Sequence, residues 1–407
     1  IHRLVARAFI GECPIGLHVL HGDGNKENNH YSIGGDNHSN LDENTGDNIL
    51  VNPPQVDYRF AGGSLANATT FYRSNVGYYI SRDQALESAA ENEPRFTCNA
   101  STGTKEGVLN EPAVTNMIRN SNSNGAVAGT QGTNPTIWDI DGTGNGLTKS
   151  ILGVGTEDGI PYIDVKYVGT TTSANNRRIS FETSTQIVTT AGEIWNSSVY
   201  VRLLTNVGGL GLSNVSLVHG IRTATAGGST VSTLVDNIVP TFGSLITQRF
   251  SNVRTLTGGT VARLFNFLRL DYGNSLNVNV ALRIGLPNLT LGPNLYAPII
   301  TSTAAVTKET DILTINLPNG DYDLDIVRLE GTTSLTGVSV TNNKYVVPTH
   351  YSPLRRVEVA DTDYVSPTQQ GTKQFFYKVL PNESNTVFGD VAYVDPYVSA
   401  SSNIVWY

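Results

Sequence analysis

Two acidic residues and an asparagine lie at the spacing of calcium ligands before residue 150. The segment WDIDGTGNG places Asp139, Asp141 and Asn145 in one short glycine-rich loop. Ca²⁺ prefers oxygen ligands, and loops of this kind supply them at alternate positions. The complete hand-type pattern would need ligands at Thr143 and a glutamate at Ser150, and neither is present. Two interpretations remain open: a structural calcium site formed by Asp139, Asp141 and Asn145, and a plain glycine-rich turn.

Histidines concentrate at the start of the chain. Five of the seven lie within the first 38 positions. There, IHRLVARAFIG has apolar residues at the spacing of a short amphipathic helix. The segment HGDGNKENN follows at residues 21–29, where Gly22 and Gly24 permit the positive φ of a turn. We therefore expect a short helix followed by a tight polar loop.

These two segments resemble the HNH homing endonucleases. That family has a His-Arg-Leu-Val-Ala helix and a His-x-Asp-Gly-Asn-x-x-Asn-Asn loop, which stand here at residues 2–6 and 21–29. The resemblance implies that His21 is the general base that activates water and that Asn29 is a ligand of a divalent cation such as Mg²⁺. The cation would stabilise the negative charge that develops on the phosphate.

Three departures favour a degenerate module over an active nuclease. Leu20 stands where many relatives have an Asp or Asn ligand, and the closing Asn-Leu-x-Trp-x-Thr element lacks its Trp after Asn40-Leu41. Residues 31–50 contain four acidic side chains and neither Lys nor Arg. A surface that closes on DNA needs cations against the phosphates. We expect a segment kept as a fold or docking piece, with an active metal-dependent nuclease as the alternative.

The composition of the whole chain is typical of an all-β protein. Charged residues make up 15%, hydrophobic residues 39%, and there are 40 glycines among 407 residues. The net charge of −8 offers no overall attraction to nucleic acid, and no apolar run reaches the roughly 20 residues of a membrane span. We expect neither binding to nucleic acid nor insertion into a membrane. Cys13 and Cys98 are interpreted as free thiols, with a disulfide between them as the alternative.

Strand-like alternation dominates after residue 50. In SLNVNVALRIG, one face carries apolar residues only, namely Leu276, Val278, Val280, Leu282 and Ile284. Similar patterns occur at residues 162–169, 178–184, 198–204 and 261–272. Roughly eight to ten such strands between residues 125 and 292 predict an antiparallel jelly-roll β-sandwich.

Turn residues divide the chain into modules. Pro53-Pro54 and Gly62-Gly63 mark a boundary near residue 50. We predict an all-β protein with five modules: an HNH-like helix-and-loop segment at 1–50, a shaft-like attachment segment at 51–122, the jelly roll at 123–300, a small β domain at 301–364 and a C-terminal β segment at 365–407.

Three segments resemble a recurring module of phage head-spike and tail-fibre proteins. Residues 71–96 have its aromatic-Arg-Ser start, its YY strand and its Ala-Ala-x-Asn-x-Pro-Arg-Phe ending, but Asp83-Gln84 replace a turn glycine. Residues 105–118 match at Gly107, Leu109, Glu111, Thr115 and Asn116. Residues 286–313 match the linker after the jelly roll, with Lys308 in place of Arg. The resemblance implies a trimeric, virion-borne spike or fibre whose jelly roll binds a surface glycan.

Other catalytic arrangements find less support in the residues. A glycosidase or lyase needs two carboxylates at a fixed separation, and no pair stands out from the scattered acids. His219 and His350 have no serine in a nucleophile-elbow context. Trp138 and Trp195 can serve as platforms for sugar stacking or as core residues. Asn-x-Ser/Thr sequons such as Asn196-Ser197-Ser198 leave a secreted lectin-like protein as a further alternative.

These observations favour a non-enzymatic structural protein on the surface of a phage particle. We expect a head spike, tail fibre or capsid decoration subunit that forms a homotrimer, contacts other virion proteins and recognises host surface polysaccharide. No cofactor is expected, apart from the possible structural Ca²⁺ and, if the HNH-like segment is active, Mg²⁺. The alternatives are a virion protein with an active nuclease and a glycan-degrading tailspike.

The purified chain is expected not to cleave plasmid DNA with Mg²⁺ or Mn²⁺. Residues 1–30 carry three cationic and three acidic side chains, and residues 31–50 add four acids. The loss of about four to six phosphate contacts lowers DNA affinity by orders of magnitude at physiological salt. Gel assays of supercoiled plasmid measure this, with His21→Ala as the control. Metal-dependent nicking that His21→Ala abolishes would establish an active nuclease instead.

Overall fold

The computed structural model describes residues 56–66, 68–211 and 214–361. This part of the chain contains 25 strands and one 3₁₀ helix, η2 (Leu245–Thr247), which confirms the predicted all-β class. No helix among these residues is long and apolar enough to span a membrane. The predicted segments at 1–50 and 365–407, with His21 and Asn29, lie outside the described residues.

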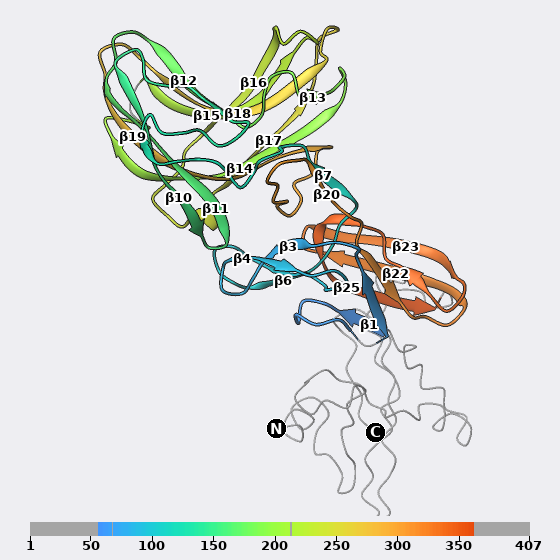
Figure 1. Ribbon diagram of the computed structural model, residues 1–407. Helices are drawn as coiled ribbons and strands as arrows, with labels where there is room; N and C mark the ends of the chain where they lie inside the picture. Colours follow the sequence, from blue (N-terminus) through green and yellow to red (C-terminus); the bar gives the residue numbers. More distant parts are fainter. Residues whose placement is uncertain (1–55, 67, 212–213, 362–407) are drawn as a thin grey trace, which may run out of the picture.

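A β-sandwich of two antiparallel sheets fills the middle of the chain (Figure 1). The β14 sheet has the order β17 (Arg249–Thr255), β14 (Ile194–Val207), β19 (Asn277–Leu291), β11 (Ile160–Thr170), β10 (Leu147–Glu157) and β8 (Gly129–Thr130). The β18 sheet has the order β16 (Thr230–Ile238), β15 (Val215–Ala224), β18 (Arg263–Tyr272), β12 (Asn175–Ser180) and β9 (Asp139–Ile140), with β13 (Ile187–Val188) also beside β18. The chain crosses between the sheets after β8, β9, β11, β13, β14, β16, β17 and β18, and the strands of each sheet pair antiparallel, which confirms the predicted antiparallel sandwich.

Alternating apolar side chains form the core between the two sheets. The predicted inward face of β19 is confirmed, because Val278, Val280, Leu282 and Ile284 are buried there and Leu276 packs against them. From the other sheet, β18 contributes Leu264, Leu268 and Leu270 to the same core. Full burial of each such side chain stabilises the fold by about 1.5–3 kcal/mol.

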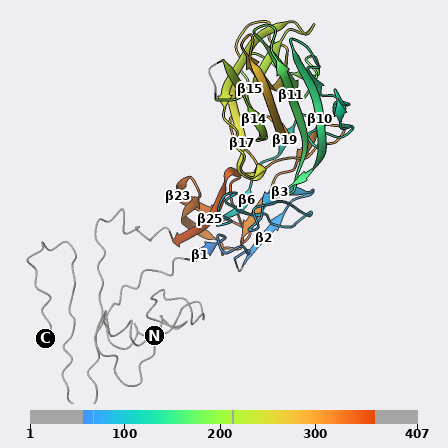
Figure 2. The same ribbon diagram turned by 90° about the vertical axis from the view of Figure 1, so that its left-hand side faces the viewer.

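A second β body lies beyond one end of the sandwich (Figures 1 and 2). Its main sheet has the order β23 (Gly331–Val340), β22 (Gly320–Arg328), β25 (His350–Asp361), β6 (Lys105–Asn110) and β5 (Phe96–Cys98), and β1 (Val56–Arg59) also pairs with β25. Smaller sheets join β2 (Thr69–Tyr72), β21 (Ile312–Ile315) and β24 (Tyr345–Val346), and β3 (Gly77–Ile80) with β4 (Leu86–Ala89).

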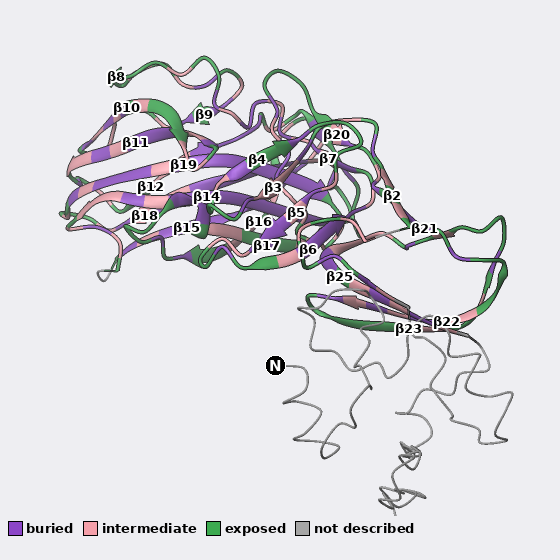
Figure 3. Ribbon diagram, turned by 90° about the horizontal axis from the view of Figure 1, so that it is seen from below, coloured by how far each residue is buried: buried purple, intermediate pink, exposed green. Residues whose placement is uncertain are grey.

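The segments predicted as separate modules at 51–122 and 301–364 form this second body together. Strands from both segments pair in its main sheet and bury one shared core. The sequence did not indicate this because pairing between strands more than 200 residues apart leaves no mark in local periodicity. Figure 3 shows that β23 presents an exposed surface, whereas the central sandwich strands β14, β15, β18 and β19 are largely buried.

The chain leaves and re-enters the second body through one antiparallel pair of strands. In this pair, β7 (Val114–Asn116) leads into the sandwich and β20 (Val306–Lys308) leads out of it. The Asn116 side chain joins the two crossings, because its Nδ2 donates to the carbonyl oxygen of Ile299 at 2.9 Å and its Oδ1 accepts from the amide of Leu289 at 3.0 Å. Both crossings are therefore held at one place.

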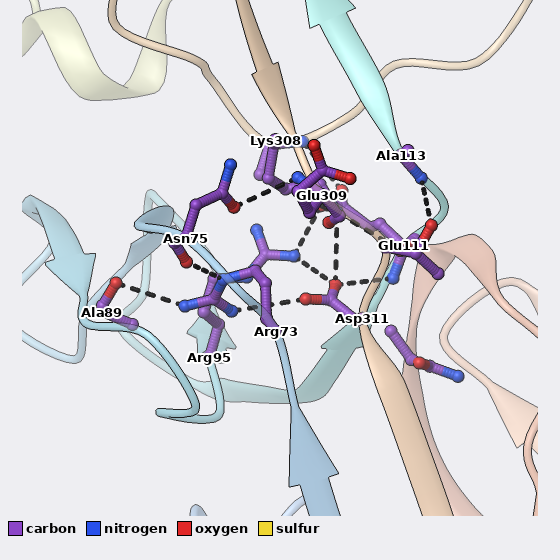
Figure 4. A network of polar contacts seen from close by, with 12 residues as sticks. Arg73, Asn75, Ala89, Arg95, Glu111, Ala113, Lys308, Glu309 and Asp311 are labelled. Carbon is purple, nitrogen blue, oxygen red and sulfur yellow. Dashed lines mark hydrogen bonds and ion pairs between the residues drawn. The ribbon is translucent and has the colours of Figure 1, made fainter.

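Five charged side chains are buried beside these crossings and form the junction network (Figure 4). The members are Arg73, Arg95, Glu111, Lys308 and Asp311. Arg95 Nη2 lies 2.8 Å from Glu111 Oε2 and 2.5 Å from Asp311 Oδ2. Arg73 Nη1 lies 3.3 Å from Asp311 Oδ1, and Lys308 Nζ lies 3.4 Å from Asp311 Oδ2.

The three segments that resemble the phage virion module meet at this network. Arg73 and Arg95 come from the first segment, Glu111 from the second, and Lys308 and Asp311 from the third. The turn at Asp83-Gln84, where the resembling module has a glycine, is present in the structure. Gln84, between β3 and β4, adopts φ 57° there, a conformation that costs a non-glycine residue about 1–2 kcal/mol.

Asp311→Asn is expected to lower the free energy of unfolding by about 3–5 kcal/mol, because it leaves buried arginines without their shared carboxylate. Asp321→Asn is the matched control. Asp321 is exposed and accepts only from Ser339 Oγ in the described contacts, so we expect a change within about 0.5 kcal/mol. Urea unfolding of both variants measures the difference. Equal effects would show that the junction network does not contribute as inferred.

Candidate functional site

The predicted calcium ligands lie at the edge of the β18 sheet, next to Arg178. Asp139 Oδ2 is 3.7 Å from Arg178 Nη2, and Asp141 Oδ2 accepts from the Arg178 backbone amide at 2.8 Å. Asn145 lies in the following turn with φ 49°. The described residues contain no group of three or more His, Cys, Asp or Glu side chains placed to hold a metal. Both aspartates therefore contact Arg178, and a calcium site here stays a prediction.

The outer face of the β18 sheet carries a second, separate apolar cluster. Alternate residues of β18 point into the sandwich core, and the residues between them point away from it. On the outward side, Phe265 and Phe267 pack against Val218 and Val235 and are 3% and 1% exposed. Two large aromatic rings thus form the floor of an outer sheet surface.

Three arginines cover these rings. Arg178 and Arg222 lie over the Phe265 ring, with the guanidinium carbon 5.7 Å and 6.0 Å from its centroid. Arg269 lies 6.0 Å from the Phe267 centroid in the same way. Such stacking holds a planar guanidinium in place and leaves its edge free for hydrogen bonds. We call this surface the arginine–phenylalanine face and define it by Arg178, Val218, Arg222, Phe265, Phe267 and Arg269.

The positive charges of this face are only partly compensated. Arg269 forms two bonds with Asp271, at 2.7 Å and 2.8 Å. Arg222 contacts Thr230 Oγ1 and has no carboxylate partner within the described part of the chain. Burial, and then the charges of Arg178 and Arg269, lower the pKa of Arg222. Arg222 thus lies in a locally positive surface, because the charged residues that affect it are also arginines.

The outer face of the β14 sheet has paired charges instead. Arg283 contacts Glu157 and lies 2.8 Å from Asp164, and Arg202 lies 2.6 Å from Glu157. The Arg283 guanidinium carbon is 3.5 Å from the Tyr162 ring centroid. Two arginines and two carboxylates therefore balance on this surface, in contrast to the uncompensated Arg222 on the opposite sheet.

Both tryptophans that were candidates for sugar stacking are core residues. Trp138 and Trp195 are 5% and 4% exposed. Trp138 packs edge-on against Phe181, with centroids 4.8 Å apart, and its Nε1 donates to the carbonyl oxygen of Asn120 at 2.8 Å. Neither indole can therefore serve as a surface platform. Cys98 is a buried free thiol, and Cys13 lies outside the described residues.

The interior of the sandwich contains a serine–histidine pair that the sequence did not indicate. Ser197 Oγ on β14 lies 2.8 Å from His219 Nε2 on β15, and Asn266 Nδ2 on β18 donates to the same Oγ at 3.0 Å. Ser197 and His219 are both 0% exposed, so no substrate reaches them in this structure. They connect the two sheets.

Comparison with known proteins gives one family match and several weak structural likenesses. Residues 1–32 match the model of the HNH endonuclease family. No curated protein matches the chain. The family match covers far less than half of the chain and concerns a segment outside the described residues.

Solved structures similar to this chain include two carbohydrate-binding proteins and one phage protein. The CBM22-1 xylan-binding domain of Paenibacillus barcinonensis Xyn10C is 12% identical, with a TM-score of 0.24, over 46% of this chain and 99% of that one. A carbohydrate-binding module of the β-sandwich superfamily is 11% identical, with a TM-score of 0.30, over 59% and 92%. Tailspike protein 4 of bacteriophage CBA120 is 13% identical, with a TM-score of 0.22, over 39% and 20%. At these TM-scores the likenesses carry no argument about function.

His219→Gln is expected to remove part of the acid sensitivity of the fold. Burial, with opposing effects of Asp236 and Arg254, lowers the pKa of His219 from 6.5 to about 4. Between these values the unfolded chain binds a proton at this site and the folded chain does not, so stability is full above pH 6.5 and falls as the pH decreases. By pH 4.5 the loss is about 2–3 kcal/mol.

Urea unfolding at pH 7.5 and pH 4.5 measures this contribution. The wild-type chain should lose about 2–3 kcal/mol more between the two pH values than His219→Gln does, because all other titrating groups are common to both. An equal loss in the two proteins would mean that His219 is not held neutral in the folded chain.

Proposed function

We propose that the chain is a non-enzymatic, virion-borne spike or fibre subunit whose sandwich contacts host surface polysaccharide. The observation that carries the proposal is the arginine–phenylalanine face, an outer sheet surface with two aromatic rings under three guanidinium groups. Guanidinium groups fixed on aromatic rings donate several hydrogen bonds at low entropic cost, and sugars offer hydroxyl and acidic acceptors. An outer sheet surface of this kind suits an extended polymer.

The virion location is supported by the three resembling segments. They converge on the junction network, so the features that carry the resemblance determine how the sandwich is attached to the second body. A subunit built for attachment and display needs such a rigid connection. We accordingly propose that the second body faces the particle and that the sandwich faces the host.

The homotrimer is part of the same proposal. Each sandwich sheet ends in open edges: β17 and β8 in one, β16 and β9 in the other. Unpaired strand edges favour aggregation unless they are covered. Close packing of three subunits around an axis would cover such edges, and three copies of one binding face would add avidity to weak single contacts.

A nuclease remains a second candidate because of one finding. The match of residues 1–32 to the HNH endonuclease family favours it, and the plasmid assay with His21→Ala tests it separately.

A glycan-degrading enzyme would need catalytic carboxylates beside the arginine–phenylalanine face. Asp139 and Asp271 each lie against an arginine, which favours an ion-pair role over that of a general acid.

The chain is expected to bind immobilised bacterial surface polysaccharides with a Kd in the micromolar range or tighter through avidity. Biolayer interferometry with neutral and acidic polymers measures this. Asn237→Trp locates the face, because Asn237 is exposed on β16 opposite Val218. A bulky ring there should change the Kd several-fold, by obstruction or by added stacking. Val253→Trp, at an exposed position on β17 of the opposite sheet, is the control and should leave the Kd unchanged. No binding to any polymer would contradict the proposed function.

A further inference from the structure

The arginines of the arginine–phenylalanine face repel one another, which destabilises the protein when no ligand is bound. Arg178 and Arg269 stand directly opposite each other in the β12–β18 pairing. Like charges at directly opposite positions destabilise a sheet. Arg222 stands opposite Phe265 in the β15–β18 pairing and has no carboxylate partner among the described residues. The fold therefore gathers three cations on one surface of a chain whose net charge is −8.

The hydrogen-bond donors of these arginines exceed the acceptors around them. Arg269 uses Nε and Nη2 for Asp271, which leaves Nη1 free of that pair. The Arg178 guanidinium has a buried Nε without a partner, and its ion pair is with the Asp139 carboxylate, which is 3.7 Å from Nη2 and 64% exposed. A planar group with two acceptor oxygens, such as a carboxylate, pairs with guanidinium edges in a bidentate manner. A neutral hydroxyl does not relieve the repulsion between the cations.

We infer that the ligand of the arginine–phenylalanine face is an acidic polysaccharide, whose carboxylate groups pair with Arg178, Arg222 and Arg269. This inference rests on the proposed function and specifies its substrate class. The phenylalanine rings hold the guanidinium groups flat, and successive acidic sugars along the polymer reach the arginines of β12, β18 and β15 in turn. Arg222 is the central contact because no carboxylate within the described ranges neutralises it.

The experiment compares one acidic polymer with its neutral counterpart. Polygalacturonate and carboxyl-reduced polygalacturonate differ in the carboxylate alone, and both are titrated against the full chain at 50 mM and 300 mM NaCl. We expect the acidic polymer to bind at least tenfold more tightly, with an affinity that falls at the higher salt concentration. Tighter or equal binding of the carboxyl-reduced polymer would overturn the inference while leaving the proposed function intact. No binding of either polymer would overturn the inference, whereas the proposed function is decided separately by the interferometry with bacterial surface polysaccharides.

Arginine variants test the residues. Arg222→Gln should weaken binding of the acidic polymer about tenfold or more, because a charge-assisted contact is lost. Arg222→Lys should retain part of the affinity, since it keeps the charge and loses the planar group. Arg202→Gln, whose arginine is already paired with Glu157 on the opposite sheet, is the matched control and should bind as the wild type does. Thermal unfolding of each variant confirms that it is folded. Folded Arg222→Gln with wild-type affinity would exclude the assigned role.

Discussion

The structure depends on one carboxylate, that of Asp311. It contacts Arg73, Arg95 and Lys308 and accepts the backbone amide of Glu111 at 2.8 Å. These partners come from the start of the described chain, from the strand that leads toward the sandwich and from the segment that returns. Burial lowers the pKa of Lys308, and the charges of Glu111 and Asp311 act in the opposite direction. A buried ionic group of this kind is stable only when all its members are in place, so it specifies one arrangement of the segments.

Apolar packing extends this connection to the base of the sandwich. Leu86 of β4 is buried with Ile160, Tyr200, Leu245 and Leu286, which belong to the sandwich. The backbone amide of Leu86 also donates to the carbonyl oxygen of Asp158 at 2.8 Å, in the turn between β10 and β11. The second body and the sandwich are thus joined by an ionic centre and an adjacent apolar contact. A binding surface on the sandwich is consequently held in a defined orientation to the second body.

Polar side chains have opposite roles inside and outside the sandwich. In the interior, Ser197, His219 and Asn266 bond to one another across the two sheets, and their burial leaves them without access to solvent. On the outer face of the β18 sheet, guanidinium groups cover aromatic rings and still present their edges. The arrangement is the reverse of the usual distribution, because aromatic residues point outward and an asparagine and a histidine point inward.

The sequence by itself determined the all-β class, the antiparallel sandwich and the inward face of β19, because alternation with a period of two is a local property of a strand buried on one side. It did not determine the inward face of β18. In LFNFLRLDY each alternating set mixes apolar and polar residues, with Asn266 among the leucines and Arg269 after the phenylalanines, so the local pattern does not decide between Leu264 and Phe265. Only packing against the facing sheet decided this, because the leucines are buried in the core and Asn266 Nδ2 donates to Ser197 Oγ of the facing sheet. Tertiary structure alone also decided that two distant segments form the second body together and that Arg73, Glu111 and Asp311 lie in one network. Their contacts join residues up to 238 positions apart, and such contacts depend on chain topology, which no local pattern encodes.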